Sequence, residues 1–120
     1  MEKATRPYNI RHRCFHFAKD ILNFERNCKY ERVHFSLFDQ LIRSGTSIGA
    51  NVVEGSSGST KRDFKNFFQI ALKSANETKY WLCLIRDTIK VDKVIIESLI
   101  KEADEISRII AAIILSAKGF

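Results

Sequence analysis

Residues 44–59, SGTSIGANVVEGSSGS, gather four of the chain's five glycines into one short window. Within it, residues 45–49 match G-x-S-x-G, the pattern around the nucleophilic serine of many hydrolases. That serine needs a strand before it and a catalytic histidine after it in the chain. Here the preceding residues, FSLFDQLIRS, space their apolar side chains as a helix does, and all three histidines precede Ser47. We therefore interpret Ser47 as a small residue in a helix and expect no catalytic residue.

Outside this window the chain has few helix breakers, and apolar residues recur at helical spacing. This periodicity predicts four helices at about residues 9–28, 36–55, 61–89 and 93–118. Thr60 and Asp92 are placed to cap the third and fourth helices, and Gly55 to end the second. Helices of this length joined by short loops predict one all-α domain, residues 1–120, folded as an antiparallel up-down-up-down four-helix bundle.

The predicted core follows the apolar stripes of these helices. In the first helix the stripe consists of Ile10, Cys14, Phe17, Ile21, Phe24 and Cys28. In the last helix it consists of Ile95, Leu99, Ala103, Ile106, Ile110, Ile113 and Ala117. Further isoleucines widen the apolar face of the last helix beyond what one bundle core buries. We therefore expect the bundle to assemble into a homo-oligomeric ring that covers the remaining apolar surface.

Charge and cysteine content narrow the class of protein. The formal net charge of +6 favours polyanionic partners, above all RNA or DNA. The three cysteines are odd in number and form no CxxC pair, which is typical of reduced thiols in a cytoplasmic protein. The first residues lack the apolar segment of a signal peptide, and no apolar run is long enough to span a membrane. We expect a cytoplasmic protein with no membrane contact.

Two constellations could suggest a metal site. His12, His16 and Asp20 share one helical face, but such a polar face is more often only solvated. Glu31 and His34 match the Glu-x-x-His element of di-iron bundles, which need a second copy that is missing here. The chain also lacks the glycine-rich phosphate loop of nucleotide-binding proteins. We predict no metal and no cofactor.

Positive charge concentrates on the first and third predicted helices. The candidate phosphate-binding residues are Lys3, Arg6, Arg11, Arg13, Arg43, Lys61, Arg62 and Lys65. A basic face that is merely solvated is the alternative interpretation. The aromatic cluster at Phe64, Phe67, Phe68 and Trp81 could stack nucleic-acid bases, but its helical spacing is more typical of a core.

Residues 40–77, QLIRSGTSIGANVVEGSSGSTKRDFKNFFQIALKSANE, resemble the four-helix-bundle family of 23S rRNA intervening-sequence proteins. The matching positions are Gln40, Arg43, Ser47, Ile48, Asn51, Glu54, Gly55, Lys61, Phe64, Phe67, Ile70, Ala71, Ser74 and Glu77. The chain departs from the family at Gly49, where proline is usual, at Gly45, where alanine is usual, and at Lys73, where glycine is usual.

The resemblance implies a homopentamer without established enzymatic activity. A related branch, the accessory variability determinant of diversity-generating retroelements, is a basic pentamer that binds nucleic acid and a reverse transcriptase. We therefore expect a non-enzymatic protein that binds RNA or DNA through phosphates as a homo-oligomer. The alternative is a protein-interaction scaffold or accessory subunit of a reverse transcriptase or other RNA enzyme. The residues alone distinguish neither these partners nor a pentamer from other rings.

The central motif also predicts a polar network. Ser47, Asn51 and Glu54 share one face of the second helix, where buried polar groups must be hydrogen-bonded. Partners could come from the third helix or from a neighbouring subunit: Lys61, Ser74 or Glu77 in the first case and Arg43 in the second. A ligand or nucleic-acid site is the alternative use of the same face. The small residues between 44 and 49 would let another helix approach closely.

Overall fold

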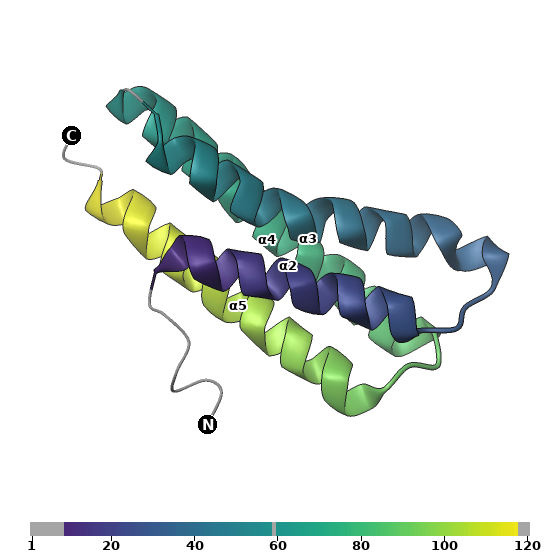
Figure 1. Ribbon diagram of the computed structural model, residues 1–120. Coiled ribbons are helices and arrows are strands. Elements are labelled where there is room, and N and C mark those ends of the chain that lie inside the picture. Colours follow the sequence, from purple (N-terminus) through teal and green to yellow (C-terminus); the bar gives the residue numbers. More distant parts are fainter. Residues whose placement is uncertain (1–8, 59, 118–120) are drawn as a thin grey trace.

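In the computed structural model, which describes residues 9–58 and 60–117, the described chain forms four α-helices and no strand (Figure 1). The helices are α2 (Ile10–Asn27), α3 (Phe35–Ser56), α4 (Lys61–Thr88) and α5 (Lys93–Ser116). A short 3-10 helix, η1 (Arg32–His34), leads directly into α3 and lies in the loop expected between the first two predicted helices. The expected four-helix arrangement is therefore observed, while residue 118, where the last predicted helix ends, lies outside the described residues.

Local side chains set the helix starts. Thr60 Oγ1 accepts a hydrogen bond from the Asp63 N–H at 3.0 Å, and Asp92 Oδ1 accepts one from the Ile95 N–H at the same distance. Both bonds satisfy N–H groups that a helix leaves unpaired in its first turn. The two caps predicted from the sequence are present, and they fix where α4 and α5 begin.

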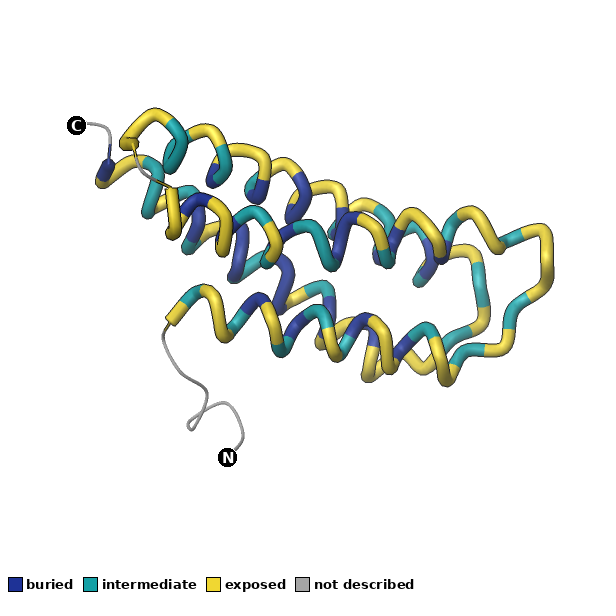
Figure 2. The backbone as a smooth tube through the Cα atoms, turned by 45° about the horizontal axis from the view of Figure 1, so that its top comes forward, coloured by how far each residue is buried: buried dark blue, intermediate teal, exposed yellow. Residues whose placement is uncertain are grey.

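Consecutive helices run in opposite directions, and α5 returns alongside α2 to close the bundle (Figure 1). The buried residues line the inner faces of all four helices, as the dark blue positions in Figure 2 show. The largest side chains that are fully enclosed are Phe17, Phe38, Phe68, Ile21, Leu41, Ile48, Leu82, Ile85, Ile96, Ile106 and Ile110. Burying these apolar groups is the main favourable contribution to folding.

The core stripe of α5 begins one residue later than the sequence predicts. Ile96 is buried, whereas Ile95 remains exposed. From Ile96 the buried positions continue at Leu99, Ala103 and Ile106, in alternating steps of three and four. Both isoleucines are equally apolar, so the hydrophobic pattern could not select between them, and packing against the other helices decides the register.

Glycines of α3 let two other helices approach closely. A Cβ atom at Gly49 would lie 3.1 Å from Cys14 Cβ on α2, and one at Gly45 would lie 3.3 Å from Ile21. The close approach predicted for the small residues is therefore observed. Gly55, however, does not end the helix: it is buried within α3, which continues to Ser56, and no described glycine has a positive φ. Gly55 instead makes room for α4.

Gly55→Val is expected to lower the free energy of unfolding by about 2 kcal/mol, because overpacking a core typically costs that much. The added Cβ would lie 2.8 Å from the Phe68 ring, which is itself buried in the core. Urea denaturation measures the effect. Ala50→Val, at an exposed position of the same helix, is the matched control and should cost well under half as much, about 0.5 kcal/mol. Equal losses would contradict this packing account.

Candidate nucleic-acid interface

A basic hollow lies on the surface of α4 near its start. It has a volume of about 360 Å³ and is lined by Lys61, Arg62, Lys65, Asn66 and Gln69. Three of these side chains carry positive charge, the other two are amides, and none is a carboxylate. Cations and amide N–H groups are donors that bind phosphate oxygens, so the hollow offers a compact anion-binding surface.

Helical geometry explains why these five residues meet. Positions 61, 62, 65, 66 and 69 fall on one side of an α-helix, since residues three and four apart are neighbours on its surface. Lys61 and Arg62 also sit in the first turn, where the helix dipole disfavours positive charge. Asp63 in the same turn supplies the acidic group that this end of a helix prefers. The helix dipole therefore does not account for the two cations at this position.

The other predicted phosphate-binding residues are spread over the bundle. Arg11 is exposed at the start of α2, at the same end of the bundle as the start of α4 (Figure 1). Arg43 is exposed on α3, nearer the opposite end. Lys3 and Arg6 lie outside the described residues. The structure thus brings Lys61, Arg62 and Lys65 into one hollow and leaves Arg11 and Arg43 outside it.

The sequence predicts that Arg13 binds phosphate, and the structure contradicts this prediction. Its guanidinium donates to both carboxylate oxygens of Glu102, at 2.7 and 3.0 Å, and also pairs with Glu105. The side chains of Arg13 and Glu102 are only 16% and 9% exposed. The hydrogen bond to Glu102 is the largest cause that holds the pKa of Arg13 above its ordinary value. Arg13 therefore joins α2 to α5 and is not available to a phosphate.

Part of the predicted polar motif forms hydrogen bonds between α3 and α4. Asn51 Nδ2 donates to the Ser47 carbonyl oxygen at 2.8 Å and to Ser47 Oγ at 2.9 Å. Ser47 Oγ also lies 3.0 Å from Ser74 Oγ on α4. These hydrogen-bond partners include no histidine and no carboxylate, so none of them can take the proton of Ser47 as a hydrolase base would. The arrangement ties two helices together.

Glu54 and Glu77 do not take part in this network. Both are exposed; Glu54 makes no side-chain hydrogen bond within the described residues, and Glu77 accepts one from Trp81 of its own helix at 3.3 Å. Periodicity placed Glu54 near Asn51, but position 54 turns outward to solvent. The residues we missed are Ser44 and Thr78, whose hydroxyl oxygens lie 2.9 Å apart in the core. The spacing of four residues between Ser74 and Thr78 places both on one helix face, and this spacing was the signal for a second polar contact.

The aromatic cluster divides between core and surface. Phe68 is buried and stacks on Phe64, with ring centroids 4.3 Å apart. Phe64, Phe67 and Trp81 are half-buried, and none of the four lines the basic hollow.

Neither a metal centre nor a membrane-spanning helix is found within residues 9–58 and 60–117. There no three His, Cys, Asp or Glu side chains gather as metal ligands would, and no helix combines the length and apolarity that crossing a bilayer requires.

Comparisons with known proteins place the chain in a family. The model of one family, described as 23S rRNA-intervening sequence protein, matches residues 6–112. A solved structure from Bacteroides thetaiotaomicron, described as a protein with unknown function from the S23 ribosomal protein family, is 37% identical. The match covers 88% of this chain and 97% of that chain, with a TM-score of 0.81. A search of curated proteins found no match. The chain therefore belongs to the 23S rRNA-intervening sequence protein family.

Proposed function

We propose that this protein binds RNA or DNA through phosphate contacts, without enzymatic activity, and that it acts as a homo-oligomer. The basic hollow of Lys61, Arg62 and Lys65 is the observation that carries the proposal. The planar guanidinium of Arg62 can bind two oxygens of one phosphate, and the lysines add point charges beside it. Asn66 and Gln69 add neutral donors that suit phosphate or sugar oxygens.

This set of groups favours the nucleic-acid backbone over the bases. No aromatic side chain lines the hollow, so it offers no platform on which bases could stack. Contacts to phosphates fix position but carry little sequence information. We therefore expect binding that depends strongly on salt and only weakly on sequence. Because the family's description refers to 23S rRNA, fragments of that RNA are the first ligands to test.

An apolar surface beside the hollow supports self-association. A second hollow, of about 840 Å³, shares Asn66 and Gln69 with the first and continues over Ile70 to Leu115 of α5. Ile70 and Leu115 are exposed in the single chain and line the same hollow, and a contiguous apolar surface of this kind marks interaction sites. A ring, five-fold as the resemblance implies, would repeat the basic hollow and strengthen weak phosphate contacts through multivalency.

Lys61→Glu/Arg62→Glu should weaken binding to an rRNA fragment by at least about tenfold at moderate salt, because two phosphate contacts become repulsive. The slope of log K against log salt should become shallower by about 2, one for each lost contact. Fluorescence anisotropy at several salt concentrations measures both quantities.

The matched control is Lys29→Glu/Lys90→Glu. It changes the net charge by the same amount, but at two residues that do not line the basic hollow. That variant should keep most of the affinity. Equal losses in the two variants would show that net charge alone attracts nucleic acid and would contradict a defined site. The accessory-subunit alternative stays a prediction, since none of the surfaces described for residues 9–58 and 60–117 singles out a reverse transcriptase.

A further inference from the structure

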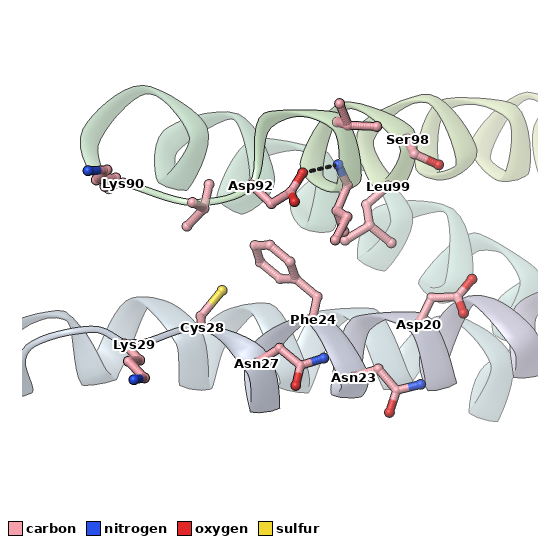
Figure 3. A pocket seen from close by; sticks show the side chains of 13 residues that line it. Asp20, Asn23, Phe24, Asn27, Cys28, Lys29, Lys90, Asp92, Ser98 and Leu99 are labelled. Carbon is pink, nitrogen blue, oxygen red and sulfur yellow. Dashed lines mark hydrogen bonds between the residues drawn. The ribbon is translucent and has the colours of Figure 1, made fainter.

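One hollow of the described residues has no role in the proposed nucleic-acid binding. It has a volume of about 860 Å³ and lies between the end of α2 and the start of α5, next to the loop that joins α4 to α5 (Figure 3). Phe24 and Leu99, each only 5% exposed, form its floor, and Val91 and Ile95 add apolar surface. We call this hollow the α2–α5 groove. Its volume and its apolar floor with a polar rim are typical of small-molecule sites.

Charge is distributed unevenly along this groove. Lys29 and Lys90 line the end nearest the α4–α5 loop, while Asp20 lies towards the other end (Figure 3). Both lysines are exposed, and neither forms an ion pair with a described residue. Asp92 also lies near the loop, but its carboxylate accepts the Ile95 N–H at 3.0 Å, and the N-terminal dipole of α5 offsets its charge. The loop end is therefore suited to an anionic group.

We propose that the α2–α5 groove binds a small amphipathic organic anion. Its apolar body would cover Phe24 and Leu99, and its carboxylate or sulfonate group would lie at the loop end, where the long, exposed side chains of Lys29 and Lys90 can turn to meet it. This pairing uses both features of the groove, since burial of the body supplies affinity and the lysines orient the ligand. The site lies on different helices and residues from the basic hollow, so each can be tested without the other.

Cys28 provides a reporter inside the groove. Its sulfur points into the space between α2 and α5 (Figure 3), and burial raises the pKa of its thiol above the ordinary value. Cys83 on α4 is also half-buried but does not line the groove, which makes it an internal control. Cys14 is buried, and burial raises the pKa of its thiol to about 12, so it should react far more slowly.

The first test uses anilinonaphthalene sulfonate, which joins an aromatic body to one sulfonate. Its fluorescence should report saturable binding to the folded protein with one site per chain. At a concentration about ten times Kd, the probe should slow alkylation of Cys28 by iodoacetamide about tenfold and leave Cys83 unchanged, as mass spectrometry can measure. Absence of saturable binding, or equal protection of both cysteines, would overturn the proposal.

The second test separates the anionic group from the apolar body. Lys29→Glu/Lys90→Glu should weaken binding of anilinonaphthalene sulfonate about tenfold or more through charge repulsion. The same variant should still bind phenylnaphthylamine, a similar aromatic body without the sulfonate. The milder Lys90→Gln should show a smaller loss in the same direction. Unchanged sulfonate binding in these variants, or equal loss of both probes, would refute the assignment of the lysines.

A cross-comparison distinguishes this site from the nucleic-acid interface. Lys61→Glu/Arg62→Glu should bind anilinonaphthalene sulfonate as the unchanged protein does, although its nucleic-acid binding should be weak. Lys29→Glu/Lys90→Glu should show the opposite pattern. Failure of either proposal then leaves the other standing, and loss of probe binding in both variants would mean that the dye reports net charge and not the groove.

Discussion

Arg13→Ala should lower the free energy of unfolding by about 3 kcal/mol, because it removes one partner of a largely buried ion pair. The change leaves the Glu102 carboxylate, only 9% exposed, without the two hydrogen bonds that Arg13 donates to it. It also releases Glu105 from the same guanidinium. Denaturation in urea at neutral pH measures the loss.

Two controls test whether the ion pair is responsible. Arg11→Ala removes an exposed arginine from the same helix and should change stability by less than about 0.5 kcal/mol. Arg13→Met/Glu102→Leu replaces both partners with apolar side chains and should recover most of the lost stability. A double variant as unstable as Arg13→Ala would contradict this account, since it would place the cost in packing and not in an unpaired charge.

Phe38→Ala should lower the free energy of unfolding by about 4 kcal/mol, the usual cost of emptying the site of a buried phenylalanine. The Phe38 ring is fully enclosed and stacks on Tyr30, with centroids 3.8 Å apart, and on Phe24 at 6.3 Å. It thus joins α3 to α2 and to the loop between them. The measurement is again urea denaturation, with thermal melting as a second observable.

Phe35→Ala is the matched control for this prediction. Phe35 is the same residue type on the same helix, but its side chain is 63% exposed. Its replacement should change the stability of the single chain by less than about 1 kcal/mol. A comparable loss at both positions would mean that α3 is rotated relative to the arrangement described here, or that Phe35 is covered in an assembly.

Much of the fold was accessible from the sequence because apolar periodicity and capping side chains are local signals. Thr60 and Asp92 cap the helices that they were predicted to cap. Prediction was wrong where two residues carry the same local signal: Ile95 and Ile96 are both apolar, and only packing selects Ile96. Glycine is common at helix ends, but the role of Gly55 depends on the Phe68 ring of another helix.

The candidate sites were less accessible because they depend on contacts between distant parts of the chain. The sequence alone suggests that Arg13 is a phosphate ligand. Its actual partner, Glu102, lies 89 positions later in the chain and is brought close only by the fold. Lys61, Arg62 and Lys65 were recognised as a basic group because they are neighbours on one helix. The α2–α5 groove could not be predicted, since its floor combines Phe24 with Leu99, and no local pattern links these two residues.

A salt titration of nucleic-acid affinity tests the central claim most directly. The unchanged protein is titrated with an rRNA fragment and with a generic duplex, while light scattering records the mass of the complex. Three cations per hollow predict that log K falls linearly with log salt, with a slope of about −3 for each chain engaged. Affinity that does not change with salt, or no binding at low salt, would contradict phosphate recognition by the basic hollow.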